Sequence, residues 1–169
     1  MTSSSRWKPR EGTTWLDKLT HEHPNHGTIV RASASQRRKG IESVLISRPL
    51  DVDAMIKRVR KGRLITVTQI RDKLALDAGT DTTCPLTTGI FLRIVAEAAE
   101  ESARSGRKRI TPWWRVIDSN GGLKRQFPGG ISRHARELRN EGHIISQAKG
   151  KQAPRVQDFE SRLVVLESL

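Results

Sequence analysis

Side chains that could take part in covalent catalysis are scarce in this sequence. The chain of 169 residues contains one cysteine, Cys84, and no tyrosine. Cys84 comes directly before Pro85, a residue favoured in the first turn of a helix. An isolated cysteine is more often a small packing residue than a nucleophile. We therefore favour a structural role for Cys84 and expect the protein not to be an enzyme.

Three histidines lie close together in the segment HEHPNH, namely His21, His23 and His26. Imidazoles at short spacing are typical zinc ligands, but zinc sites take a second ligand pair or cysteines, and none lies nearby. We expect a solvated loop and no metal. The segment GGLKRQFPGG lacks the Gly-Lys-Ser/Thr ending of a phosphate-binding loop, so we expect no cofactor.

Two adjacent indoles, Trp113 and Trp114, stand in a glycine-containing region. An indole has no nucleophilic lone pair, but its ring can stack on a nucleobase, which typically contributes ~1–3 kcal/mol per base. One hypothesis is that at least one indole lines a base pocket. The alternative is that both are core aromatics that anchor a loop between two helices.

The charge balance identifies the class of partner. The chain has 31 Lys and Arg against 18 Asp and Glu, a net charge of +13. A field of this sign favours a polyanion, and nucleic acid is the usual one. Residues 1–50 carry nine basic and four acidic side chains, a net charge of +5, and residues 51–169 carry the remaining net charge of +8. No apolar run is long enough to span a membrane, so we expect no membrane contact and a cytoplasmic location.

The elements that must position these residues fall into two parts. Residues 1–49 show no sustained period and are expected to form a basic, largely irregular N-terminal arm. Two islands in it are more ordered: TTWLDKLT is expected to be a short helix, and the run Ile41–Ile46 a short strand. Residues 50–169 are expected to form one domain.

Apolar spacing in residues 50–169 predicts four helices and a hairpin. We expect a helix capped by Asp51 and ended by Gly62, a second capped by Thr68, a third from Pro85 to Gly106 and a fourth over 131–142. HIISQ and RVQDF are expected to pair, with SRLVVLESL as a last apolar element. The expected fold class is mainly α with a small β-hairpin, a winged helix-turn-helix.

One segment carries a resemblance to a known family. Pro112-Trp113-Trp114-Arg115-Val116 is followed by Phe127-Pro128-Gly129-Gly130 and then by Glu141-Gly142. This order resembles the O6-alkylguanine-DNA alkyltransferases, whose Pro-Cys-His-Arg-Val motif carries the cysteine that accepts an alkyl group from a flipped guanine. Here Trp113 stands at the cysteine position and Trp114 at the histidine position. The sequence looks like the alkyltransferase-like branch, which binds alkylated DNA without repairing it.

The resemblance covers roughly residues 50–145 and is weaker upstream of the tryptophans. The segment 62–70 is similar to the family's Gly-x-Val-x-Thr-Tyr-Gly-x-Ile, with Val67 at the position of the tyrosine that assists nucleotide rotation. Leu86-Thr87-Thr88-Gly89 lies where the family has Arg-Ala-Val-Gly on its recognition helix. Leu86 thus replaces the arginine that fills the gap left by the extruded base, although an apolar side chain can also wedge between bases.

The resemblance implies a non-enzymatic protein that recognises O6-alkylguanine in double-stranded DNA and flags it for repair, with a repair protein as a further partner. The alternative is a general nucleic-acid or ribonucleoprotein-binding winged-helix protein without lesion specificity. Arg115 either contacts a phosphate or pairs with Glu141 or Asp118. The expected lesion-pocket residues are Trp113, Trp114, Arg115, Val116, Phe127, Pro128 and Gly129. The expected DNA contacts are Thr66, Thr68, Gln69, Leu86, Thr87, Thr88, Gly89, Arg93, Arg107, Lys108, Arg109, Lys124 and Arg125, with further phosphate contacts from Arg104, Arg133, Arg136 and Arg139.

Overall fold

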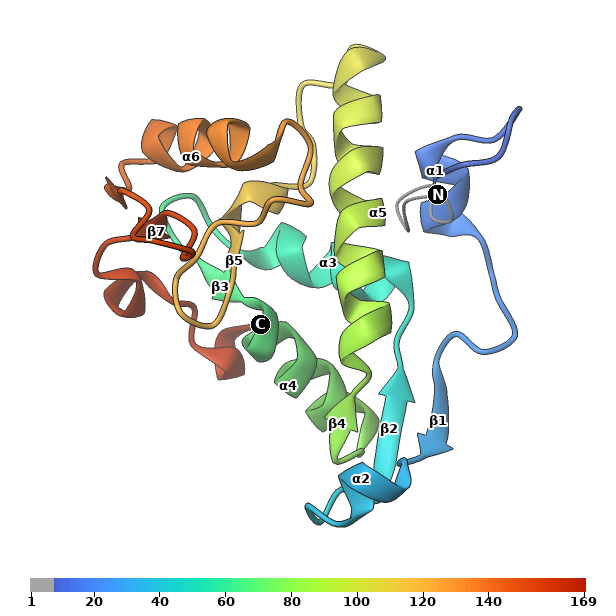
Figure 1. The fold of residues 1–169 in the computed structure, drawn as a ribbon. Coiled ribbons are helices and arrows are strands. Elements are labelled where there is room, and N and C mark those ends of the chain that lie inside the picture. Colours follow the sequence, from blue (N-terminus) through green and yellow to red (C-terminus); the bar gives the residue numbers. More distant parts are fainter. Residues whose placement is uncertain (1–7) are drawn as a thin grey trace.

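The computed structural model describes residues 8–169, so the first seven residues of the expected N-terminal arm lie outside the described part. Helices dominate, and the strands are short (Figure 1). The elements in chain order are α1 (Trp15–Thr20), β1 (Thr28–Arg31), α2 (Ala34–Arg37), β2 (Ser43–Ile46), α3 (Pro49–Arg58), β3 (Ile65–Thr66), α4 (Val67–Ala78), β4 (Thr82–Thr83), α5 (Pro85–Arg104), η1 (Trp113–Arg115), β5 (Val116–Ile117), α6 (Gly130–Asn140), β6 (Ile145–Ser146), β7 (Arg155–Val156), η2 (Phe159–Arg162) and η3 (Leu166–Ser168), where η marks a 3-10 helix.

The long helix α5 is the centre of the larger core. Phe91, Leu92 and Val95 are buried in it, and α3 and α1 pack against α5. In Figure 1 the N-terminal segment lies on one side of α5, and α6 with the C-terminal elements lies on the other. Within the described residues, no helix is long and apolar enough to cross a membrane.

The helices expected from periodicity are present, with shifted bounds. Helix α3 ends at Arg58 with Val59 as its C-cap, and not at Gly62 as expected. Helix α3 begins at Pro49, so Asp51 lies in its first turn and is not the N-cap. Helix α4 is capped by Thr66 and not by Thr68, because Thr66 and Gln69 form a reciprocal capping box. Helix α5 starts at Pro85, and α6 matches the expected fourth helix. The four core helices therefore follow from the sequence pattern.

The N-terminal segment is more regular than the sequence indicates. The helix expected in TTWLDKLT is α1, and the strand expected within Ile41–Ile46 is β2. Strand β1 and helix α2 were not expected. Strand β1 pairs antiparallel with β2 in the register Thr28 to Ile46, and β2 pairs in parallel with β4. These pairings join residues 28–46 to the loop before α5.

Two carboxylates fasten the N-terminal segment to the helices. Asp81, in the loop between α4 and α5, accepts hydrogen bonds from the backbone amides of Glu42 and Ser43 at 2.8 and 3.0 Å. Glu101 of α5 accepts from the amides of Trp15 and Leu16, at the start of α1, at 3.0 and 3.2 Å. The first amides of a helix have no partner within that helix, so Glu101 satisfies donors that α1 cannot.

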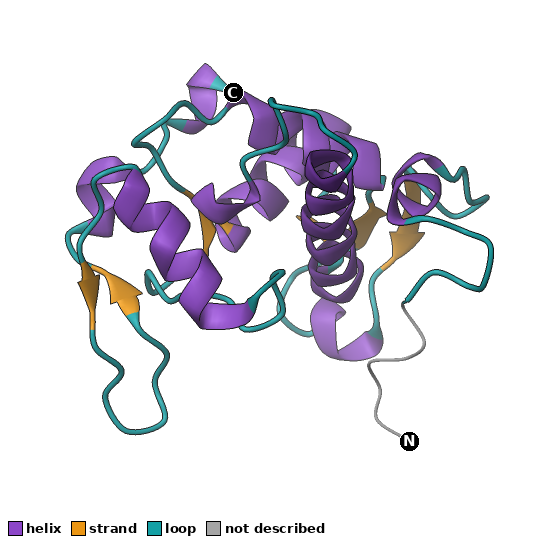
Figure 2. Ribbon diagram, turned by 90° about the horizontal axis from the view of Figure 1, so that it is seen from above, coloured by secondary structure: helices purple, strands orange, loops and turns teal. Residues whose placement is uncertain are grey.

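A second, smaller core lies between α6 and the C-terminal elements. Leu64, Ile117, Leu123 and Leu138 are almost fully buried in it. Strands β3 and β5 pair in parallel and place the start of α4 beside the Trp113–Arg115 turn. The expected C-terminal hairpin is present as β6 and β7, which pair antiparallel, and its long connecting loop extends away from the rest of the molecule (Figure 2).

Candidate nucleic-acid interface

Trp113 lies in the core. Its side chain is fully buried, and its Nε1 donates to Glu100 Oε1 at 3.1 Å. Glu100 also accepts from Arg133 of α6 at 3.2 Å. The Trp113 ring packs edge-on against Phe127 with ring centroids 5.3 Å apart. Trp113 therefore supports the Phe127 loop from beneath and presents no surface of its own, which is the arrangement of a core aromatic.

Trp114 and Arg115 share one carboxylate. Trp114 Nε1 and Arg115 Nη2 both donate to Glu141 Oε1 at 2.8 Å, and the backbone amide of Gly62 donates to Glu141 Oε2 at 3.0 Å. Burial opposes ionisation of Glu141, but the hydrogen bonds from Arg115, Gly62 and Trp114 outweigh it and lower the pKa of Glu141. Glu141 is therefore the partner of Arg115 in the structure, and it is one of the partners expected from the sequence.

His134 ties α6 to the turn that contains the two tryptophans. Its Nδ1 accepts from the backbone amide of Lys124 at 3.1 Å, so the proton of the neutral ring is on Nε2, which lies 2.8 Å from the Trp114 carbonyl oxygen. Burial lowers the pKa of His134 to about 4. Neither His134 nor Glu100 was expected from the sequence. The available signal was that His134 lies on the apolar face of α6, three residues after Ile131 and four before Leu138.

The glycines of the Phe127-Pro128-Gly129-Gly130 turn have a steric role. Gly129 has a φ of +75°, and a Cβ atom there would lie 2.5 Å from Cβ of Arg133. A side chain at residue 129 would therefore clash with the first turns of α6 and move the loop. Val116 is buried beneath this region, and Pro128 is half-buried.

A groove of about 310 Å³ runs between the first half of α5 and this loop. Leu86, Gly89 and Arg93 of α5 line one side, and Lys124 and Phe127 line the other. Leu86 is 70% exposed, although it is apolar. The Nε atom of Arg93 is buried and has no hydrogen-bond partner among the described residues. The groove therefore has an exposed apolar side chain at its edge and a cationic residue, Arg93, in its wall.

Some of the expected DNA contacts are engaged inside the protein. Thr66 and Gln69 form the α4 capping box, and Gln69 Nε2 also donates to the Val164 carbonyl at 2.9 Å. Thr88 is fully buried and donates to the Cys84 carbonyl at 2.7 Å, and Thr87 donates to the same oxygen at 3.3 Å. The expected contacts that are exposed are Thr68, Leu86, Gly89, Arg104, Arg107, Lys108, Arg109, Arg125, Arg136 and Arg139.

The basic side chains form separate groups. Arg107, Lys108 and Arg109 follow the C-terminus of α5, whereas Leu86 is at its N-terminus. A helix of 20 residues is about 30 Å long, so the structure does not bring Leu86 close to these three cations. Lys124 pairs with Asp118 at 2.7 Å, and Arg125 beside it is exposed.

Cys84 and the three histidines of residues 21–26 are the remaining side chains considered above for nucleophilic or metal chemistry. Cys84 is half-buried at the N-cap of α5, and its carbonyl accepts from the two threonines above. Within residues 8–169 no group of three or more His, Cys, Asp or Glu side chains could hold a metal ion. The three histidines instead lie against one another, with His26 against Phe91.

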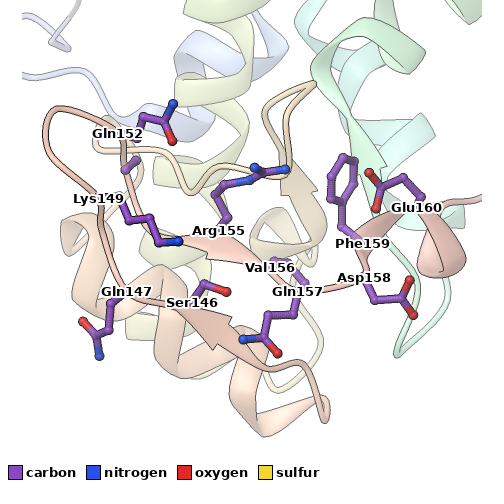
Figure 3. A pocket seen from close by; sticks show the side chains of 11 residues that line it. Ser146, Gln147, Lys149, Gln152, Arg155, Val156, Gln157, Asp158, Phe159 and Glu160 are labelled. Carbon is purple, nitrogen blue, oxygen red and sulfur yellow. The ribbon is translucent and has the colours of Figure 1, made fainter.

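A further polar cavity of about 320 Å³ lies at the C-terminal hairpin. Figure 3 shows Lys149 and Arg155 on one side of it and Asp158 and Glu160 on the other. The Arg155 guanidinium lies 5.9 Å from the centre of the Phe159 ring. Since both signs of charge line this cavity, it offers no clear preference for an anion.

No family model matches the sequence, and neither does any curated protein. Among solved structures, the crystal structure of Schizosaccharomyces pombe Atl1 in complex with damaged DNA containing O6-carboxymethylguanine is similar, with a TM-score of 0.49 and 19% identity. The alignment covers 69% of this chain and 94% of that chain. At this level of likeness, the residues of this chain alone carry the functional conclusion.

Proposed function

We propose that this protein is a non-enzymatic DNA-binding protein that docks the N-terminal half of α5 on duplex DNA and receives an O6-alkylguanine in the groove beside that helix. The observation that carries the proposal is that an exposed leucine, Leu86, lies at the edge of the groove. Leu86, an apolar residue that is 70% exposed, stands at the edge of a groove whose wall includes the cationic Arg93.

Each part of this arrangement has a physical role. Leu86 acts as a wedge between base steps, as apolar side chains of minor-groove proteins do. Arg93 places a positive charge in the wall of the groove, which favours the approach of a phosphate group. The Phe127 loop forms the opposite wall, and Trp113 and His134 hold that loop in place.

The two tryptophans act as supports in this proposal, and neither serves as an exposed base platform. Trp113 occupies the position at which the alkyltransferase motif has its cysteine, and its indole is fully buried. Without a nucleophile in the groove, a bound alkyl group stays on the base. We propose that the complex then marks the lesion for repair proteins.

A titration of fluorescently labelled duplexes tests the proposal. Wild-type protein is expected to bind a duplex with one O6-methylguanine at least fivefold more tightly than the plain duplex. Leu86→Ala is expected to remove most of that difference. The matched control is Leu76→Ala on α4, because Leu76 is 72% exposed and lies outside the groove. Equal binding of modified and plain duplexes by the wild type would refute lesion recognition.

A second candidate function is general nucleic-acid or ribonucleoprotein binding without lesion preference. The burial of Trp113 and the separation of the basic groups along α5 favour it. It predicts that plain DNA, modified DNA and structured RNA bind with similar affinity and steep salt dependence. The same titration, extended to an RNA hairpin, separates the two candidates.

A further inference from the structure

A larger cleft lies where residues 8–26 fold against α5. It has a volume of about 490 Å³, which is within the range of small-molecule sites. Its apolar floor is formed by Ile90, Phe91 and Ile94 of α5. Ile90 and Ile94 also line the groove described above, so the cleft and the groove share a part of the same helix.

Cations outnumber anions along the walls of the cleft. Lys8, Arg10 and Lys18 line it together with the three histidines. Among the described lining residues Asp17 is the one carboxylate, and it accepts a hydrogen bond from the Thr14 amide at 2.8 Å as part of the α1 cap. Asp17 keeps its negative charge there, and the three cations outnumber it.

The imidazoles form a continuous row of rings. The centroids of His21 and His23 are 6.5 Å apart, those of His23 and His26 are 5.3 Å apart, and His26 lies edge-on to Phe91 at 5.1 Å. The backbone amide of Asn25 donates to His23 Nδ1 at 3.1 Å and orients that ring. Flat aromatic rings of this kind are surfaces on which a nucleobase can stack.

The electrostatics of the cleft favour an anionic ligand. Burial and the nearby Arg10 lower the pKa of Lys18. Burial, followed by the charges of His23, His21 and Arg48, lowers the pKa of His26. Lys18 and Arg10 thus repel each other, and an anion placed between them would relieve that repulsion.

We propose that this cleft binds a nucleotide unit, with the phosphate at Arg10, Lys8 and Lys18 and the base against the histidine row. The shared chemistry is a phosphate next to a flat ring, and the source is either a free nucleotide or a nucleotide within a single strand. A metal ion is disfavoured because the cations that line the cleft would repel it. The proposal is independent of lesion recognition, since it involves no duplex.

The test is calorimetric titration of the full chain with four probes: dGMP, deoxyguanosine, inorganic phosphate and an oligothymidylate of eight nucleotides. Saturable binding of dGMP or of the oligonucleotide is expected. Tighter binding of dGMP would identify a free nucleotide as the source, and tighter binding of the oligonucleotide would identify a strand. Arg10→Gln and His23→Ala are each expected to weaken binding at least fivefold. The matched control is Lys39→Ala, an exposed cation of the same segment that does not line the cleft.

Three results would overturn the proposal. These are no saturable binding of either dGMP or the oligonucleotide, binding that Arg10→Gln and His23→Ala leave unchanged, and inorganic phosphate binding as tightly as dGMP. Thermal unfolding confirms that the variants are folded, and the exposure of His23 makes that expected. Leu86→Ala is expected to bind dGMP normally, so a failure of lesion recognition and a failure of this proposal give different results.

Discussion

The Nε2 atom of His134 lies 2.8 Å from the carbonyl oxygen of Trp114, while its Nδ1 accepts the amide of Lys124. One neutral imidazole thus joins α6, the Phe127 loop and the Trp113–Arg115 turn. Protonation would place a hydrogen on Nδ1, facing the Lys124 N–H, and would break one of the two contacts. The wall of the groove therefore depends on the charge state of a side chain that does not line it.

The first prediction is a loss of stability in mild acid. The pKa of His134 is about 4 in the folded protein and 6.5 ordinarily, so the unfolded chain takes up a proton first as the pH falls. Stability from this group is therefore complete above pH 6.5, decreases between pH 6.5 and 4, and changes no further below. Between pH 7 and pH 5 the expected loss is about 2 kcal/mol, measured by urea unfolding.

Two variants isolate this effect. His134→Gln cannot titrate and is expected to be less stable at pH 7 but to lose much less on going to pH 5. His23→Gln, which replaces an exposed histidine, is expected to keep the wild-type loss. Burial also lowers the pKa of His143, which remains in both variants and cancels, whereas His26 loses in His23→Gln one of the charges that lower its pKa, so its own contribution is smaller in that variant. A wild-type loss in His134→Gln would contradict the assignment.

The second prediction concerns the carboxylate shared by Trp114 and Arg115. Glu141→Gln leaves the Arg115 guanidinium, whose side chain is 14% exposed, without its counter-charge. Removal of one member of such a pair is expected to lower the free energy of unfolding by about 3 kcal/mol. Asp77→Asn is the control, because Asp77 is 54% exposed in its pair with Lys73. A change of less than about 1 kcal/mol is expected in that control. Equal losses of stability in the two variants would argue against a stabilising role for the carboxylate of Glu141.

The third prediction separates support from contact in the groove. Trp113→Ala removes a fully buried indole and is expected to cost about 4 kcal/mol of stability. Leu86→Ala removes an exposed side chain and is expected to change stability by less than about 0.5 kcal/mol. Trp113→Ala is expected to lose binding of a modified duplex only near the temperature at which this variant unfolds. Leu86→Ala is expected to lose this binding while it is fully folded. At lower temperature a selective defect in Leu86→Ala identifies the contact residue.

The fourth prediction is about salt. Arg125 is exposed beside the groove, and its replacement by alanine is expected to weaken plain and modified duplexes equally. If Arg125 neutralises one phosphate, the slope of log affinity against log salt is expected to decrease by about 1. Lys39→Ala, on the N-terminal segment, is expected to leave the slope unchanged. A selective effect of Arg125→Ala on the modified duplex would mean that this side chain reads the base.

The four long helices could be predicted because their apolar residues recur every three or four positions. Strands β1 and β4 could not. In β1, Ile29 and Val30 are both largely exposed, so there is no alternation to detect. Strand β4 has two residues, and its place is determined by backbone pairing with β2, a partner 38 residues away in the sequence.

The candidate site was predicted in part. The pattern around Trp113 located the turn and the loop correctly, but it gave no indication of which way the indole points. That direction depends on Glu100, which is on another helix and accepts the indole N–H. Exposure of Leu86 likewise depends on the packing of α5. Residues distant in the sequence therefore determine both the direction of the Trp113 indole and the exposure of Leu86. A single sequence does not show which distant residues come into contact.

The two amide hydrogen bonds that Glu101 accepts from α1 have a consequence for work on shortened forms of the protein. A chain that begins at residue 50 would lack the cover of α1 on α5, expose apolar side chains such as Ile94 and leave β4 without its neighbour. Contiguous apolar surface of this kind promotes self-association. Loss of DNA binding in such a truncated protein would therefore report aggregation as readily as a missing contact, which is why point substitutions are the informative probes of the N-terminal segment.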